Sequence, residues 1–150
     1  MNDFDFFAGR WDVTNRRLVK PLSGSSEWEE FPGRTVATRH FDGAASFDEI
    51  EFPTKGFNGL TLRVYNQETR QWSIYWASSA RGTLDASPMV GAFEGDRGEF
   101  HGEEDHEGGR VRCRFLWTVI DPGTARWEQA FSDDDGRTWE TNWTMDFRRA

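Results

Sequence analysis

Residues 138–147 read Thr-Trp-Glu-Thr-Asn-Trp-Thr-Met-Asp-Phe, and this strict alternation decides the fold class. Successive side chains of a β-strand point to opposite faces, so every second residue shares a face. On a regular strand over 137–148, the apolar face predicted to point inward consists of Trp139, Thr141, Trp143, Met145 and Phe147. The opposite face is polar and is predicted to point outward; it consists of Thr138, Glu140, Asn142, Thr144 and Asp146.

The same alternation recurs along the whole sequence between turn signals of Gly, Pro, Asn and Asp. It predicts about ten strands, at 9–19, 27–41, 45–53, 58–66, 70–79, 89–94, 97–103, 109–121, 124–132 and 137–148. The connections are too short for the helical crossovers of a parallel sheet, so the strands form an antiparallel meander. We therefore expect a single all-β domain over 1–150, closed into a roughly ten-stranded barrel, with one short helix from Asn2 or Asp3 to Phe7.

The period of two also predicts which other side chains point inward. These are Trp11, Val13, Asn15 and Arg17; Leu60, Leu62 and Val64; Trp72, Ile74 and Trp76; Val111, Cys113, Phe115, Trp117 and Val119; and Trp127, Gln129 and Phe131. Tryptophans from four strands are thus expected to meet inside the barrel.

The register of the strand at 45–53 stays open. One phase points Asp48, Ile50 and Phe52 inward, and the other points Phe47, Glu49 and Glu51 inward. Either phase brings an acid to the barrel side. That acid needs Arg17, Arg39 or Arg63 as a partner if it is to stay ionised.

Charge and composition limit the partners and the location. Lys and Arg number 18 and Asp and Glu number 26, which gives a net charge of −8 that disfavours binding to nucleic acid. No apolar run is long enough to cross a bilayer, and residues 1–7 lack the features of a signal peptide. The single cysteine, Cys113, is expected to be a reduced, buried thiol. We expect a cytoplasmic protein that binds neither membrane nor nucleic acid.

Gly9-Arg10-Trp11 follows a short aromatic segment and precedes an all-antiparallel chain, and Arg149 falls on the inward phase of the last strand. This pattern resembles the calycin group, the lipocalin and fatty-acid-binding barrels, in which an arginine near the C-terminus packs across the tryptophan of the G-x-W signature. The resemblance implies a structural contact between Trp11 and Arg149.

The resemblance extends over nearly the whole sequence. Residues 59–65, 72–76, 126–132 and 138–149 are similar to a bacterial family of uncharacterised calycin-like proteins. Membership of that family implies a fold and brings no established activity.

Ser132-Asp133-Asp134-Asp135-Gly136-Arg137-Thr138-Trp139 matches the Asp-box pattern S-x-D-x-G-x-T-W of sialidase propellers. Turn chemistry explains every residue of this motif. An aspartate caps turn amides, Gly136 takes a positive φ, and the tryptophan packs back over the loop. We expect a structural hairpin here in preference to a sugar or metal site.

The histidines are the next candidates for chemistry. His101 and His106 bracket an acidic stretch that could hold a divalent cation, but a solvated hairpin tip is the favoured interpretation, so we expect no metal site. His40 is expected to line the lumen with Val36 and Thr38, as a general base, as a haem ligand or as a structural histidine. Haem-binding barrels of the nitrobindin type take their histidine from late in the chain. This sequence has no histidine after His106, so we expect no cofactor.

Three functions follow from these residues. The leading one is binding of a small hydrophobic or aromatic molecule, with Trp76, Trp117, Trp127 and Trp143 as walls and Arg17, His40 and Gln129 as polar anchors. The second is an acid–base enzyme of the isomerase or cyclase type, acting through His40 and an acid of the third strand. The third is a barrel filled by its own side chains that acts as an interaction module. The sequence leaves a homodimer open.

Overall fold

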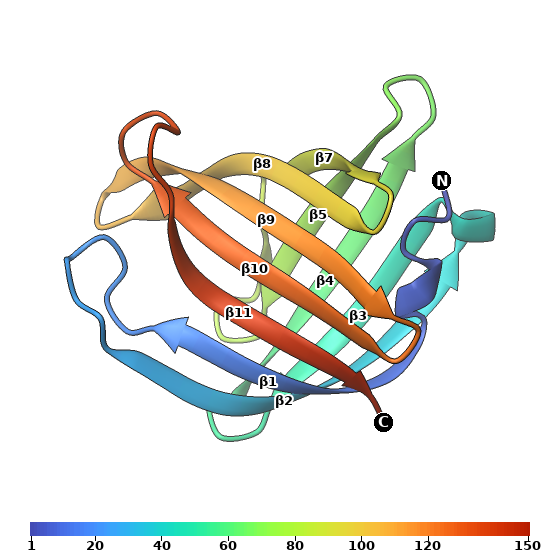
Figure 1. The fold of residues 1–150 in the computed structure, drawn as a ribbon, viewed down its shortest axis with the longest axis horizontal. Coiled ribbons are helices and arrows are strands. Elements are labelled where there is room, and N and C mark those ends of the chain that lie inside the picture. The colour runs from blue at the N-terminus through green and yellow to red at the C-terminus, as the bar shows by residue number, and fades with distance from the viewer.

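A computed structural model of residues 1–150 is an antiparallel β-barrel with only two short 3₁₀ turns (Figure 1). The turns are η1 (Asp5–Phe7) and η2 (Phe41–Gly43). The strands are β1 (Gly9–Leu18), β2 (Trp28–His40), β3 (Ala45–Phe52), β4 (Phe57–Asn66), β5 (Gln71–Ser78), β6 (Thr83–Leu84), β7 (Met89–Glu94), β8 (Arg97–His106), β9 (Gly109–Asp121), β10 (Thr124–Ser132) and β11 (Glu140–Arg149).

The strand order confirms the predicted meander. Each strand from β1 to β5 and from β7 to β11 pairs with its neighbours along the chain, and β1 pairs with β11 to close the ring. The ring has ten strands, as predicted, and the two-residue β6 adds only to the end of β5. The β5–β7 pairing is the shortest in the ring, because it joins residues 72–74 to 89–91 alone.

The two chain ends lie at the same end of the barrel, where η1 turns inward ahead of β1 (Figure 1). The predicted helix from Asn2 or Asp3 shrinks to this 3₁₀ turn, and no side chain caps it. Asp3 instead accepts a hydrogen bond from Nε1 of Trp72 at 2.9 Å. Neither helical turn has the length or the apolar character needed to span a membrane.

A β-bulge in β11 corrects the predicted phase of that strand. Gln129 pairs with Trp143 but Ala130 pairs with Thr141, so Asn142 is the extra residue. The bulge keeps Trp143, Met145 and Phe147 inward and places Asn142 in the interior. N-terminal to the bulge the phase is inverted, so the predictions that Trp139 and Thr141 point inward and Asn142 outward were wrong.

The phase of β4 also differs from the prediction. Leu60 and Leu62 are 40% and 37% exposed on the outer face, whereas Thr61 and Arg63 are buried inside. The reason lies in the neighbouring strands: a side chain at Gly59 would collide with Trp76, because an added Cβ would lie 2.0 Å from the indole Cη2. The inward phase of β4 is therefore the one that contains Gly59.

The structure settles the open register of β3. Asp48, Ile50 and Phe52 are buried and point inward, while Glu49 and Glu51 are exposed. Asp48 pairs along the sheet with Thr61, and Ile50 pairs with Gly59.

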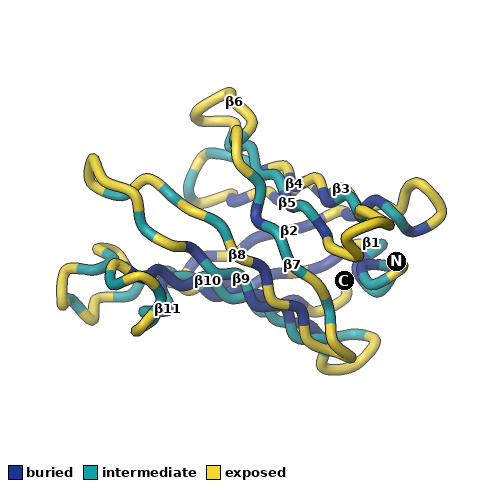
Figure 2. Tube along the Cα trace, turned by 90° about the horizontal axis from the view of Figure 1, so that it is seen from above, coloured by how far each residue is buried: buried dark blue, intermediate teal, exposed yellow.

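Aromatic rings fill the half of the barrel next to the chain ends. The ring of Phe4 lies 4.9 Å from Trp72 and 5.0 Å from Phe93, and the ring of Phe7 lies 5.0 Å from Trp117 and 5.1 Å from Phe147. Burial is concentrated in the middle of the strands and at this end, whereas the hairpin tips are exposed (Figure 2). Cys113 is buried as predicted, and burial raises the pKa of its thiol.

Candidate functional site

The other half of the barrel is hollow. It encloses a cavity of about 340 Å³ that starts above Phe7 and Trp117 and reaches the hairpins at the far end. Most of its wall is apolar, and its aromatic lining includes Trp76, Phe115, Trp127, Phe131 and Trp143. An enclosed apolar space with a few polar groups is the usual form of a small-molecule site.

The aromatic walls are held in place by one another and by hydrogen bonds. The ring of Trp127 lies edge-on to Trp143 at 5.6 Å and to Phe115 at 5.1 Å. Trp143 Nε1 donates a hydrogen bond to Asn15 Oδ1 at 3.1 Å, and Gln129 Nε2 donates to Asn142 Oδ1 at 2.9 Å. These contacts fix the walls before any ligand enters, which lowers the entropic cost of binding.

A buried ion pair forms the floor of the cavity. Arg63 Nη2 lies 2.7 Å from Asp48 Oδ1, and the two side chains are only 4% and 6% exposed. Burial raises the pKa of Asp48, and the adjacent guanidinium of Arg63 opposes that shift. The guanidinium also lies 5.0 Å from the ring of Phe4 and 5.2 Å from that of Phe7. The pair therefore separates the filled half of the barrel from the hollow half.

The open end of the cavity is lined by Arg81, Asp85, Glu104, Asp105 and His106. Arg81 and Asp85 come from the segment that connects β5 to β7, and the other three come from the end of β8. His106 Nε2 donates a hydrogen bond to the carbonyl oxygen of Pro21 at 3.1 Å, and its ring lies 5.7 Å from Phe131. The sequence interpretation of 101–106 as a solvated hairpin tip therefore missed that one face of this strand reaches the cavity.

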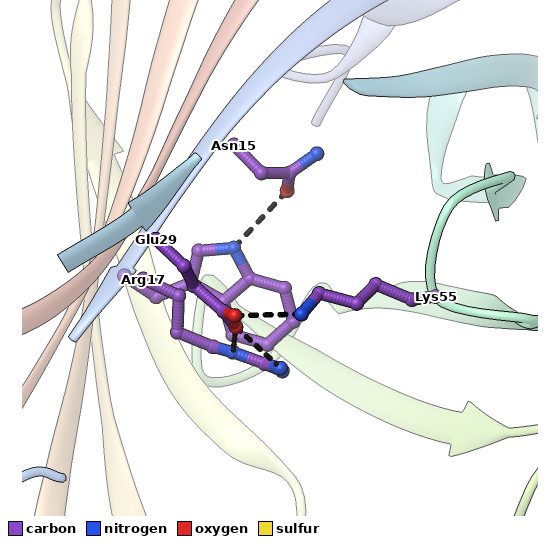
Figure 3. Close-up of polar contacts among 5 residues, drawn as sticks. Asn15, Arg17, Glu29 and Lys55 are labelled. Atoms are coloured by element: carbon purple, nitrogen blue, oxygen red, sulfur yellow. Dashed lines mark hydrogen bonds and ion pairs between the residues drawn. The ribbon is translucent and has the colours of Figure 1, made fainter. Parts of the chain in front are cut away.

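Arg17 points inward as predicted but does not line the cavity. It lies behind Trp143, with its guanidinium carbon 5.0 Å from the indole centroid. Arg17 donates to Glu29 Oε1 at 3.0 Å, and Lys55 donates to Glu29 Oε2 at 2.6 Å (Figure 3). The hydrogen bond from Lys55 is the main cause of the lowered pKa of Glu29. This cluster joins β1, β2 and the β3–β4 turn, and it supports the wall from outside the cavity.

The structure brings five of the seven residues predicted to bind ligand to the cavity: Trp76, Trp117, Trp127, Gln129 and Trp143. His40 is not among them. It lies on the outer face of β2 with Thr38 and Val36, and its Nε2 is 2.7 Å from the Thr38 hydroxyl. The expectation that His40 lines the lumen was wrong, because β2 buries Thr35 and Ala37 in the opposite phase. A general base or haem ligand at His40 would face away from Asp48 and from the cavity.

The Asp-box forms the predicted hairpin. Asp134 accepts hydrogen bonds from the Thr138 amide at 2.9 Å, the Thr138 hydroxyl at 2.6 Å and the Ser132 hydroxyl at 2.7 Å, and these bonds lower its pKa. Gly136 has φ of +85°. Trp139 packs on the outer face, 4.7 Å from the guanidinium of Arg114.

Neither histidine of the acidic stretch belongs to a cluster of potential metal ligands. His101 lies outside the barrel, with Nε2 2.9 Å from Glu99. No group of three or more His, Cys, Asp or Glu side chains is arranged to hold a metal ion.

The contact implied between Trp11 and Arg149 is present at the filled end. The guanidinium carbon of Arg149 lies 4.3 Å from the Trp11 ring centroid. The same guanidinium donates to the carbonyl oxygens of Phe6, Ala8 and Pro122. It thereby ties the N-terminal segment, the β9–β10 turn and β11 together.

Comparisons with known proteins support the fold and leave the function open. No protein-family model matches the sequence, and no curated protein matches it. A solved structure described as a redesigned β-barrel is similar, with a TM-score of 0.52 and 9% sequence identity over 99% of this chain and 96% of that one. At this identity the likeness concerns the architecture alone: the chain is a closed antiparallel β-barrel of ten strands.

Proposed function

We propose that the protein binds a small hydrophobic or aromatic molecule in the hollow half of its barrel. The observation that carries this proposal is the cavity of about 340 Å³, enclosed by aromatic walls and placed above a filled half. Side chains fill an ordinary core to the density of organic crystals, so a space of this size is a departure that needs an occupant. The alternative of a completely filled barrel does not fit this cavity.

The size and lining limit the ligand. Small-molecule sites span roughly 300–1,000 Å³, and this cavity lies at the small end of that range. A compact aromatic molecule fits such a space better than a long lipid chain. Trp76, Trp127 and Trp143 offer ring faces and edges for stacking, and Gln129 offers a polar group on the wall.

We also propose that the protein is related to the calycin barrels and to the bacterial calycin-like family that its sequence resembles. The support is the packing of Arg149 across Trp11 beside the N-terminal 3₁₀ turn, the contact that the G-x-W signature implies. This kinship favours ligand binding in the lumen as the general role.

The binding proposal is tested by isothermal titration calorimetry with 1-naphthylmethanol, a neutral aromatic probe. We expect saturable binding to the purified protein. Gln129→Trp adds bulk to the cavity wall and should abolish binding, whereas Glu128→Trp, on the opposite face of β10, should leave it unchanged. Equal binding to the protein and to the Gln129→Trp variant, or no binding to either, would contradict the proposal.

A further inference from the structure

The cavity carries an uneven charge. Its lining contains four carboxylates and two guanidinium groups: Asp48, Asp85, Glu104, Asp105, Arg63 and Arg81. Two of these charges, on Asp48 and Arg63, are opposite in sign and 2.7 Å apart, so the floor contributes no net charge. The excess of negative charge is therefore at the open end.

Two acids at the open end lack an ion-pair partner. Asp105 is paired with Arg110 at 3.0 Å, but no cationic group lies within 4.0 Å of Asp85 or Glu104. Burial raises the pKa of Glu104, and the neighbouring charge of Asp85 raises it further. The guanidinium of Arg81 acts on both acids from beyond ion-pair distance and offsets part of their charge, which leaves one negative charge in excess. Two partly buried carboxylates that repel each other are a favourable place for a positive charge.

The floor of the cavity is a closed ion pair. Asp48 and Arg63 both line the cavity, but the Oδ1 atom of Asp48 is fully buried, 2.7 Å from Arg63 Nη2. The floor therefore offers no free charge of either sign to a ligand, and charge selection is left to the open end. The unpartnered Nε of Arg63 is buried and does not present a donor to an anion.

The walls suit the same ligand. Trp76, Trp127 and Trp143 line the space between the floor and the open end, and tryptophan has the ring face that attracts cations most strongly. A carboxylate ligand would meet the acids at the open end and aromatic faces of the same sign. A cation with an apolar body is attracted by both.

We propose that the cavity selects a small organic cation, an ammonium or amidinium group on an aromatic or apolar body, over neutral and carboxylate molecules of the same shape. This proposal rests on the proposed function and names the substrate class of that site. One uncompensated charge about 6 Å away, in a medium between protein surface and water, is worth on the order of tenfold in affinity.

The test compares three probes that share one ring system: 1-naphthylmethylammonium, 1-naphthylmethanol and 1-naphthaleneacetate. Calorimetric titration at neutral pH and low salt should give the tightest binding for the ammonium, about tenfold tighter than the alcohol, and the weakest for the carboxylate. If the alcohol binds and the ammonium binds no tighter, or the carboxylate binds best, the charge selection is wrong and the binding cavity stands. If no probe binds, both proposals fail.

Variants assign the selection to its residues. The double change Asp85→Asn and Glu104→Gln should reduce the ratio of the ammonium affinity to the alcohol affinity about tenfold. Glu103→Gln is the matched control, because Glu103 neighbours Glu104 on β8 but faces outward and pairs with Arg110. An unchanged preference in the double variant, or an equal loss in the control, would overturn the assignment.

Discussion

Replacing Arg63 with methionine tests whether the floor of the cavity is a buried charge pair. Arg63→Met leaves Asp48 buried without its counter-ion, since both side chains are almost inaccessible to water. Removing one partner of a buried pair costs about 3–5 kcal/mol. For a chain of this size 1 kcal/mol shifts Tm by about 2–4 °C, so we expect Tm to fall by roughly 6–20 °C.

The pH dependence of this loss identifies its cause. Without Arg63 the folded-state pKa of Asp48 rises further above its ordinary value of 3.8, because burial then acts unopposed. A raised folded-state pKa destabilises the fold at every pH above the unfolded-state pKa. This cost is constant above the folded-state pKa and shrinks as pH falls from there toward the unfolded-state pKa. The deficit of Arg63→Met relative to the natural protein should therefore shrink by about 1.4 kcal/mol per pH unit as pH falls from the folded-state pKa of Asp48 in the variant to its folded-state pKa in the natural protein.

Two further variants extend the test. Asp48→Asn leaves the guanidinium of Arg63 buried without a counter-ion, and this group cannot release its proton. The stability deficit of Asp48→Asn should therefore not shrink on acidification. The double variant Asp48→Leu with Arg63→Met buries no charge. Its loss in unfolding free energy should be much smaller than the losses of Asp48→Asn and Arg63→Met added together. Urea unfolding from neutral to mildly acidic pH measures all four proteins. A loss below about 1 kcal/mol in Arg63→Met, or a deficit that does not vary with pH, would refute a buried, ionised pair.

Three further outcomes follow from the contacts described. Arg149→Gln should lower the unfolding free energy in urea by about 1–2 kcal/mol, because an exposed cation–π contact and backbone hydrogen bonds are lost. The control Arg148→Gln should change it by less than about 0.5 kcal/mol. Equal effects of the two variants would contradict a special role for Arg149. Gly59→Ala should push the Trp76 indole into the cavity and weaken 1-naphthylmethanol binding about tenfold in calorimetry; unchanged affinity would show that Trp76 moves freely. Asp134→Asn should lower Tm at neutral pH, and because the pKa of Asp134 is lowered by folding, this difference should vanish in melts as pH falls below the ordinary value of 3.8; a difference that persists in acid would argue against its hydrogen bonds as the cause.

Alternation predicted the barrel and most of its aromatic lining, because a period of two is a local property of each strand. Trp76, Trp117, Trp127 and Trp143 come from four strands, and each lines the cavity as its own strand predicts. The sequence offered three arginines as the ion-pair partner of the buried acid on β3. In the structure that acid is Asp48 and its partner is Arg63.

The misplaced residues depend on neighbours that a single strand does not record. The bulge at Asn142 arises from the pairing of β11 with β10, so nothing in residues 138–147 marks where the phase inverts. The phase of β4 depends on the size of Trp76 across the sheet, and the leucines that misled the prediction face outward.

The open end was the least predictable part of the site. Arg81 and Asp85 lie between β5 and β7 in a segment without alternation. The two-residue β6 folds this segment back along the end of β5, and the Asp85 amide donates a hydrogen bond to the Trp76 carbonyl oxygen at 2.8 Å. Glu104 and His106 lie on β8 where this strand runs past the end of its partner β7. In the sequence this stretch is polar throughout, so its inward-facing residues could not be told from those of a solvated hairpin tip.

The division of the interior into a filled and a hollow half has a consequence for how such a protein changes over time. The packed rings around Phe4, Phe7 and Trp117 contribute apolar burial that does not depend on what occupies the space above them. Substitutions at the open end can therefore change which molecule is retained without weakening the part of the core that keeps the chain folded. The Asp48–Arg63 pair, Phe7 and Trp117 lie at the boundary and belong to both halves, and there a change of specificity must also be a change of stability.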